Sequence, residues 1–345
     1  MPQSTRRHRW RTLLAVAGTV VLATAGITSI RLGSAAADAV PLAATAGCGK
    51  APALSSGTHT IQSSGQSRSF ILRVPANYNS SNPYRLIFAF HWRGGTMNDV
   101  ASGGSSGNSW AYYGMLEQSN NSAILVAPQG LGNGWANSGG QDLTFVDDMM
   151  RRVEEALCVD TTQRFAMGFS YGGGMSYAIA CARASAFRAV AVYSGAQLSG
   201  CSGGTQPIAY FGIHGISDNV LNISSGRSLR DTFVRNNGCA AQSPREPSQG
   251  SGAHITTAYS CRAGYPVQWA AFDGGHGPGP VDGCSGCEDG VRTWTKGEVW
   301  RFFAQFAGTN PTPDPTTPPP NPTGNRLRNE ASGRCLDVSG AATTN

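Results

Sequence analysis

Apolar positions follow two different spacings along the chain, and these spacings predict strands and helices in turn. Short apolar runs typical of buried strands occupy residues 68–75, 84–91, 123–128, 164–167, 189–193, 207–214 and 267–272. Helical spacing or small-residue composition predicts helices over 142–157, 173–183 and 294–306. Strands alternating with helices predict an α/β fold with a mainly parallel, doubly wound sheet covered on both faces. Functional residues of such a sheet lie at the carboxyl ends of its strands.

The pattern Gly-x-Ser-x-Gly occurs three times, at 103–107, 168–172 and 200–204, in a chain of 345 residues that contains 45 glycines. A nucleophilic serine at a sharp turn, or nucleophile elbow, needs a strand directly before it and a helix directly after it. Ser105 has no strand before it, and Ser202 has no helix after it. Ser170 has both, because "FAMGF" precedes it and "GGGMSYAIACA" follows it. We therefore predict Ser170 as the nucleophile.

A serine nucleophile needs a histidine base, and the histidine needs a carboxylate that fixes its tautomer. The chain order in an α/β-hydrolase is serine, acid, histidine. Asp218 follows the strand at 207–214, and His276 follows the strand at 267–272 in a glycine-rich loop. Asp273 is the rival acid, but it lies three residues before His276 and suits a supporting role in that turn. We predict a triad of Ser170, Asp218 and His276.

An oxyanion hole requires backbone N–H groups directed at the negative charge of the intermediate. The predicted donors are the N–H of Tyr171 and one from the loop after strand 84–91, either Trp92 or Arg93. The side chain of Trp92 is a candidate wall for an aromatic pocket, and Trp135 is a candidate platform for a sugar or an aromatic ring. For both tryptophans, an ordinary structural role in a loop is the alternative.

The N-terminus has the features of a secretory signal, assigned to residues 1–39. Arginines at 6, 7, 9 and 11 precede an uncharged run over 12–30, and small residues at 35–39 offer cleavage sites. An uncleaved membrane anchor is the alternative, because the run is nearly long enough to span a bilayer. Without Arg31 and the four earlier arginines, the net charge of +6 falls to near neutral, which gives nucleic-acid binding no electrostatic basis. We predict a secreted protein without stable membrane association.

The cysteine content also indicates an oxidising compartment. Eight of the nine cysteines fall between Cys48 and Cys287, an even number that is compatible with four disulfides. Two bridges are predicted, Cys239 with Cys261 and Cys284 with Cys287. Zinc binding by the Cys284-x-x-Cys287 pair is weakly supported because there is no second such pair, so neither a metal nor a cofactor is predicted.

A Pro/Thr-rich stretch at 308–324 is predicted to be a semi-rigid linker between a catalytic block at 48–307 and a short tail at 325–345. The tail sequence "GRCLDV" resembles the opening of a ricin-type β-trefoil lectin repeat. That resemblance implies a carbohydrate-binding domain of which only a fragment is present, with Asp337 as a sugar-binding residue. A tail without a fixed structure is the alternative.

Four stretches of the catalytic block together resemble a known family: "LIFAFHWRGGTMNDV", "VAPQGLGNGWANSGGQDLTFVDDMM", "VDTTQRFAMGFSYGGGMSYAIAC" and "FDGGHGP". They are similar to secreted feruloyl esterases of the polyhydroxybutyrate-depolymerase-like group in carbohydrate esterase family one. The resemblance implies an α/β-hydrolase with Ser170, Asp218 and His276 as its triad and no cofactor. It also implies cleavage of ferulate from arabinose on plant xylan, so that feruloylated arabinoxylan is the expected partner.

The residues beside Ser170 and His276 exclude the tannase-like subgroup of this family, whereas the ester substrate stays open. Tannase-like feruloyl esterases carry disulfide-linked cysteines beside the nucleophile and the histidine, whereas Phe169 and Gly277 occupy those positions here. The same motifs also serve polyhydroxyalkanoate depolymerases and acetyl xylan esterases. The linker and the lectin-like tail favour a polysaccharide over a polyester as the substrate.

Overall fold

The computed structural model describes residues 44–307, 326–328 and 335–337. The predicted signal segment and the predicted linker lie outside these residues. In the tail, β10 (Arg326–Arg328) pairs in antiparallel fashion with β11 (Cys335–Asp337). No helix in the described part of the chain is long and apolar enough to cross a membrane.

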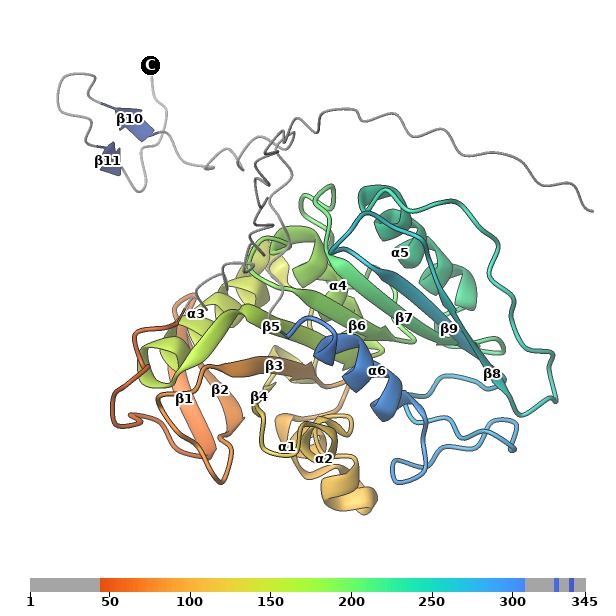
Figure 1. Ribbon diagram of the computed structural model, residues 1–345, viewed down its shortest axis with the longest axis horizontal. Coiled ribbons are helices and arrows are strands. Elements are labelled where there is room, and N and C mark those ends of the chain that lie inside the picture. Colours follow the sequence, from red (N-terminus) through yellow and green to blue (C-terminus); the bar gives the residue numbers. More distant parts are fainter. Residues whose placement is uncertain (1–43, 308–325, 329–334, 338–345) are drawn as a thin grey trace, which may run out of the picture. The chain divides into compact units, whose positions relative to one another are not determined.

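A nine-stranded sheet runs through the described body, in the order β1-β2-β4-β3-β5-β6-β7-β9-β8 (Figure 1). The central strands, from β4 to β9 in this order, pair in parallel. The pairs at the two edges, β1 with β2, β2 with β4 and β8 with β9, are antiparallel. The strands are β1 (Gly57–Ser63), β2 (Gln66–Arg73), β3 (Tyr84–Phe90), β4 (Ala123–Pro128), β5 (Val159–Phe169), β6 (Ala189–Tyr193), β7 (Ala209–Gly215), β8 (His254–Ala258) and β9 (Val267–Phe272).

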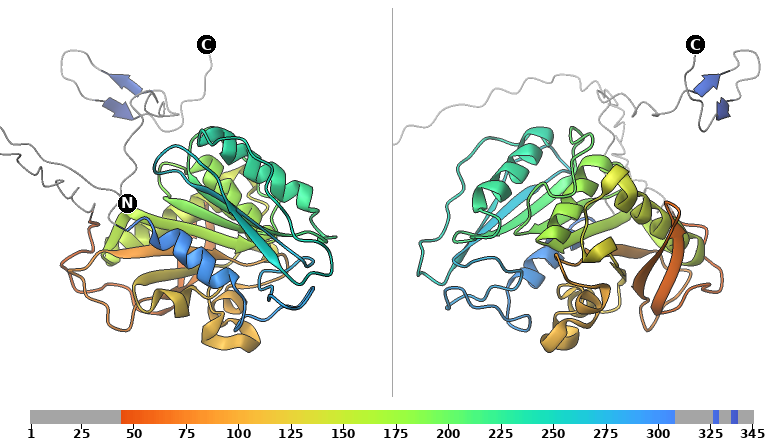
Figure 2. Two further views of the ribbon diagram at one scale, coloured as in Figure 1. Left: turned by 45° about the vertical axis from the view of Figure 1, so that its right-hand side comes forward. Right: turned by 180° about the vertical axis from the view of Figure 1, so that it is seen from behind.

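Helices cover both faces of this sheet, as the two further views make clear (Figure 2). One face packs against α3 (Gln141–Ala156), α4 (Tyr171–Ala182) and α5 (Ile223–Asn236). The other face packs against α1 (Met97–Ser102), α2 (Met115–Ser119) and α6 (Thr295–Ala304). The predicted doubly wound α/β architecture is therefore confirmed.

Central strand β3 shows how the sequence produces two cores. Successive side chains of a strand point to opposite faces of the sheet. Leu86, Phe88 and Phe90 accordingly join the core beneath α3, α4 and α5. Ile87 and Ala89 join the core beneath α1, α2 and α6. All five side chains are fully buried, which explains why β3 reads as a continuous apolar run rather than an alternating one.

The edge strands and the shorter helices are not among the predicted elements. In β1, polar residues such as Thr58 and Thr60 are exposed, and β8 is a partly exposed edge strand within the polar segment between Cys239 and Cys261. An edge strand buries little surface, so its sequence carries few of the apolar residues that mark a central strand.

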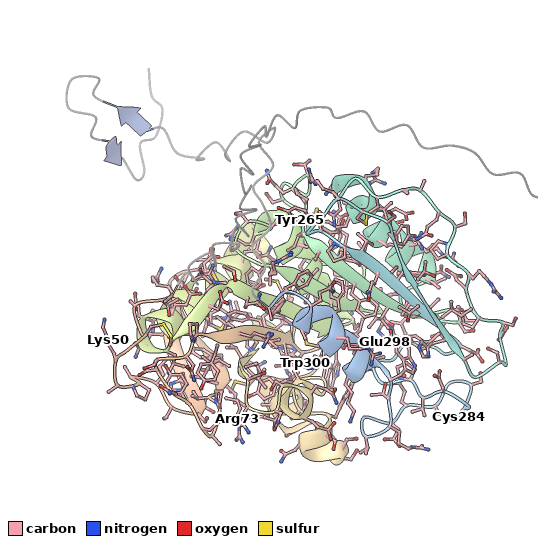
Figure 3. The ribbon with its side chains drawn as sticks, viewed as in Figure 1. Lys50, Arg73, Tyr265, Cys284, Glu298 and Trp300 are labelled. Carbon is pink, nitrogen blue, oxygen red and sulfur yellow. A yellow bond between two sulfur atoms is a disulfide. The ribbon has the colours of Figure 1, made fainter. Side chains whose placement is uncertain are left out.

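Four disulfides stabilise the body of the protein. Cys239 bonds to Cys261, and Cys284 bonds to Cys287, which confirms the two predicted bridges. The other two join Cys48 to Cys158 and Cys181 to Cys201. The bond between Cys284 and Cys287, which lies in the loop after β9 (Figure 3), removes both thiolates that a zinc ion would need.

His254 on β8 contacts both the loop after β9 and helix α6. Its Nδ1 lies 2.8 Å from Asp282 in the loop after β9, and its Nε2 lies 3.4 Å from Glu298 on α6. Glu298 is labelled in Figure 3. The imidazole stacks on Trp294 with ring centroids 3.8 Å apart. Burial disfavours the charged imidazole, but the contacts with Glu298 and Asp282 outweigh it and raise the pKa of His254 above 6.5.

This arrangement predicts a pH-dependent contribution to stability. Because the folded-state pKa of His254 is raised, the contribution is fully present below the unfolded pKa and is lost as pH rises through the folded pKa. His254→Gln should therefore lower the melting temperature at acidic pH and have a smaller effect at alkaline pH. Thermal melts of both proteins from acidic to alkaline pH measure the difference. His59→Gln on β1 is the matched control. An equal fall in melting temperature at every pH would contradict a role for the charged imidazole of His254.

Candidate active site

Ser170 occupies the sharp turn between β5 and α4. Its backbone has φ 56° and ψ −114°, a sparsely populated conformation for a residue with a side chain. The turn is held by the Ser170 N–H, which donates to the Tyr193 carbonyl at 2.9 Å. It also requires glycine on both sides: a Cβ on Gly168 would lie 2.5 Å from the Gly172 carbonyl carbon, and one on Gly172 would lie 2.1 Å from Phe90 O.

The structure brings the three predicted triad residues together from the ends of β5, β7 and β9. His276 Nε2 lies 2.9 Å from Ser170 Oγ, and His276 Nδ1 lies 2.7 Å from Asp218 Oδ2. Both distances are those of hydrogen bonds. The Ser170 residue is 9% exposed and the His276 side chain is 14% exposed, so both remain within reach of a substrate at the surface.

Asp218 is held as a carboxylate by a set of converging donors. The backbone N–H groups of Val220 and Leu221 both donate to its Oδ1, at 2.9 and 2.8 Å. His214 Nε2 lies 3.2 Å from its Oδ2 and 2.7 Å from the Leu221 carbonyl. Burial opposes the charge, but the hydrogen bonds from His214, His276 and the two N–H groups outweigh it and lower the pKa of Asp218 to about 2. The carboxylate therefore stays ionised at any ordinary working pH.

Asp273, the rival acid, is occupied elsewhere. Its Oδ2 accepts a hydrogen bond of 2.7 Å from the Gly252 N–H, and its residue is 5% exposed. This contact joins the start of the histidine loop to the turn before β8. The geometry therefore separates the two acids: Asp218 contacts His276, whereas Asp273 braces the adjacent turn.

The predicted oxyanion donors lie on two elements that flank Ser170. Tyr171 is the first residue of α4, and the first N–H groups of a helix have no partner within the helix. Trp92 and Arg93 lie in the loop directly after β3. That loop is anchored by Gly94, whose N–H donates to the Asn133 carbonyl at 2.8 Å. The helix N-terminus also favours negative charge at Ser170.

His91 supports this loop, a structural role that the sequence did not reveal. Its Nδ1 lies 2.7 Å from the Trp92 carbonyl, and its Nε2 accepts from the Gly130 N–H at 2.9 Å. These two partners fix the neutral tautomer that carries its proton on Nδ1. Burial lowers the pKa of His91, which favours the same neutral form. The side chain thereby sets the position of the Trp92 peptide.

The prediction of Trp135 as a binding platform is wrong. Trp135 is fully buried, and its indole N–H donates to the His91 carbonyl at 2.8 Å. Its ring packs edge-on against Phe90, with centroids 5.1 Å apart. Trp135 is therefore a structural residue beneath the oxyanion loop. Trp92 is only partly buried, and its ring lies 6.3 Å from that of Phe169, so it stays a candidate pocket wall.

These side chains can support acyl transfer. A serine hydroxyl is hydrogen-bonded to an imidazole, the imidazole is hydrogen-bonded to a buried carboxylate, and a helix N-terminus lies beside the serine. Within residues 44–307 and the two tail strands, no cluster of three or more His, Cys, Asp or Glu side chains is placed to hold a metal ion. The fold and the site are those of a carboxylic ester hydrolase with the α/β-hydrolase fold.

Comparison with known proteins places the chain more narrowly. It is 47% identical over 258 residues to feruloyl esterase C of Emericella nidulans, covering 74% of this chain and 90% of that protein. It is 49% identical over 255 residues to a probable feruloyl esterase C of Aspergillus terreus, covering 74% and 91%. Feruloyl esterase D of Neurospora crassa is 45% identical over 269 residues, covering 76% and 91%. The chain belongs to the feruloyl esterase family.

Structural comparison supports the fold. An acetyl xylan esterase from Aspergillus awamori superposes with a TM-score of 0.50 at 15% identity, covering 72% of this chain and 99% of that one. At that identity the likeness concerns the fold alone. No protein-family model matches the chain.

Proposed function

We propose that the protein hydrolyses feruloyl esters on plant cell-wall arabinoxylan through a covalent feruloyl-enzyme formed on Ser170. The observation that carries the proposal is the position of His276, which lies within hydrogen-bond distance of both Ser170 Oγ and Asp218 Oδ2. Membership of the feruloyl esterase family supports the choice of acyl group.

In the first step, His276 Nε2 takes the proton of Ser170 as Oγ attacks the ester carbonyl carbon. The resulting oxyanion accepts hydrogen bonds from the Tyr171 N–H and from the N–H of Trp92 or Arg93. Asp218 stabilises the imidazolium of His276. The imidazolium then gives its proton to the departing sugar oxygen, which leaves the feruloyl group on Ser170.

In the second step, water replaces the sugar alcohol. His276 removes a proton from the water, the resulting hydroxide attacks the feruloyl carbonyl, and the same N–H groups stabilise the second oxyanion. Collapse of this intermediate breaks the bond to Ser170 Oγ and returns the proton to the serine. Ferulate leaves, and the enzyme is restored without a cofactor in either step.

The proposal also includes secretion of the protein and binding of sugar by its C-terminal tail. Four disulfides and the N-terminal sequence of basic, uncharged and small-residue segments support secretion. The tail strand β11 includes Asp337, the proposed sugar-binding residue of a ricin-type lectin repeat. Such a tail would keep the enzyme close to polysaccharide.

A substrate panel tests this function. The panel contains feruloylated arabinoxylan, methyl ferulate, acetyl xylan and short polyhydroxybutyrate, each assayed for release of its acid. We expect kcat/KM for feruloyl esters to exceed that for the acetyl and hydroxybutyryl esters. Equal turnover of acetyl and feruloyl esters would contradict the specificity, and preferred turnover of polyhydroxybutyrate would assign the same triad to a polyester depolymerase.

A further inference from the structure

A cavity of about 510 Å³ lies between two segments that are far apart in the sequence, and Trp92 of the proposed oxyanion loop also lines it. One wall comes from residues 99–113, which include the C-terminal part of α1 and the 3₁₀ turn at Gly104–Ser109. The other wall comes from residues 279–290 in the loop after β9. The volume falls in the range of pockets that bind small organic molecules.

Two residues connect this cavity to the reacting groups. Trp92 forms one wall, and its backbone N–H is a proposed oxyanion donor. Gly279 forms another wall and lies three residues after His276. The ring of Phe169, the residue before Ser170, lies 4.7 Å from the imidazole of His276 and 6.3 Å from the ring of Trp92. Trp92 and the histidine loop therefore border both the reacting groups and the cavity.

The walls of the cavity present flat aromatic surfaces. Trp92 and Trp110 are both partly buried, which leaves part of each ring accessible. Trp110 is held in place by glycines of the opposite wall: a Cβ on Gly290 would lie 2.5 Å from Trp110 Cγ, and one on Gly279 would lie 3.6 Å from Trp110 Cζ2. Aromatic side chains favour a planar aromatic ligand through stacking or edge contacts.

Three carboxylates line the cavity, and each of them accepts a hydrogen bond from a backbone N–H. Asp99 closes the N-terminal capping box of α1 with Thr96. Asp289 accepts from the Arg292 N–H and also pairs with its guanidinium. Both acids therefore already act as structural acceptors.

Glu288 differs from these two acids in its surroundings. Its Oε2 accepts a hydrogen bond of 2.6 Å from the Gly279 N–H, and a Cβ on Gly277 would lie 2.0 Å from its Oε1. The carboxyl group is therefore packed against the histidine loop, although the residue as a whole is exposed. Desolvation of the carboxyl group where it packs against the histidine loop outweighs the hydrogen bond from Gly279 and raises its pKa above the usual range. In its ionised form the carboxyl group accepts hydrogen bonds and can take one from a ligand hydroxyl.

We propose that this cavity binds the aromatic ring of the acyl group between Trp92 and Trp110, with the phenolic hydroxyl of the ring hydrogen-bonded to Glu288. The assignment rests on the proposed function of Ser170. It makes Glu288 a specificity residue that distinguishes hydroxylated cinnamoyl esters from plain ones. A phenol donates a hydrogen bond to a carboxylate, and such charge-assisted bonds are stronger than neutral ones.

The first test uses three methyl esters that differ only in the ring: cinnamate, 4-hydroxycinnamate and 4-methoxycinnamate. The parent enzyme should prefer the 4-hydroxy ester. Glu288→Gln keeps an acceptor for the Gly279 N–H but removes the charge, so the preference for the 4-hydroxy ester over cinnamate should fall about 10-fold. An unchanged preference in Glu288→Gln would overturn the role of Glu288.

The second test blocks the cavity without altering buried packing. Ser105 lines the cavity and is exposed, so Ser105→Leu should narrow the cavity. The ratio of kcat/KM for methyl ferulate to that for 4-nitrophenyl acetate should fall about 10-fold or more, because acetate is too small to need the cavity. Asn108→Leu is the matched control, since Asn108 is exposed in the same 3₁₀ turn but does not line the cavity.

These measurements distinguish an error in the role of the cavity from an error in the proposed function of Ser170. Trp110→Ala should lower the same ratio, and a thermal melt shows whether that variant folds. If Ser105→Leu and a folded Trp110→Ala slow both esters equally, the cavity does not hold the acyl ring. If Ser170→Ala retains turnover of both esters, the proposed function itself is wrong, whatever the cavity variants show.

Discussion

Ser170→Ala is expected to lower kcat for methyl ferulate by at least about 10⁴-fold, because the variant lacks the hydroxyl that forms the ester bond to the acyl group. Residual turnover would come from the oxyanion donors and the bound geometry alone. The fold should persist, since alanine keeps the Cβ that already occupies the turn at φ 56° and loses only the hydroxyl that contacts His276. The measurement is steady-state release of ferulate, with a thermal melt of each protein.

Ser202→Ala is the matched control for this variant. Ser202 sits in another copy of the Gly-x-Ser-x-Gly pattern, at 200–204, but not between a strand and a helix. Its loss should leave ferulate release close to that of the parent protein. A similar loss in both variants would show that the change acts through the fold rather than through a nucleophile.

Asp218→Asn is expected to lower kcat by about 10⁴-fold. The local hydrogen bonds decide how the new amide is oriented. Two backbone N–H groups, those of Val220 and Leu221, both donate to Oδ1, so the amide oxygen must take that position. The amide nitrogen then faces His276 Nδ1 and donates to it. This bond fixes the tautomer with its proton on Nε2, which cannot accept the proton of Ser170.

Asp273→Asn is the matched control for Asp218→Asn. It makes the same chemical change three residues before His276, at a carboxylate that accepts from the Gly252 N–H. We expect a loss of stability from this variant, with kcat reduced far less than in Asp218→Asn. Stopped-time assays with methyl ferulate and thermal melts measure both effects. A larger fall in kcat for Asp273→Asn would reverse the assignment of the acid.

Much of the fold could be predicted because central parallel strands are buried on both faces. Strands such as β4 and β6 consist entirely of buried residues, and their predicted bounds agree with the structure. Edge strand β8 is only partly buried, so its sequence resembles that of a loop. Helix α5 also escaped prediction, because only five of its fourteen residues are buried and its exposed face is polar.

The grouping of the triad follows from chain order, because the parallel strands β5, β7 and β9 deliver their carboxyl ends to the same edge of the sheet. The supporting residues carry no such signal. His91 and His214 act through contacts with Gly130 and Leu221, which only the folded chain brings near. The burial of Trp135 is likewise a tertiary property, since a tryptophan in a glycine-rich loop has the same sequence pattern whether it faces solvent or the core.

The central claim is that Ser170 is an activated nucleophile that becomes covalently acylated. The most direct measurement is titration with an alkyl fluorophosphonate, which forms a stable bond to an activated serine, followed by peptide mass analysis. The account predicts loss of ferulate release in proportion to label, with one label per chain on the peptide that contains Ser170. Full loss of activity with the label on another residue, or an active enzyme that takes no label, would contradict it.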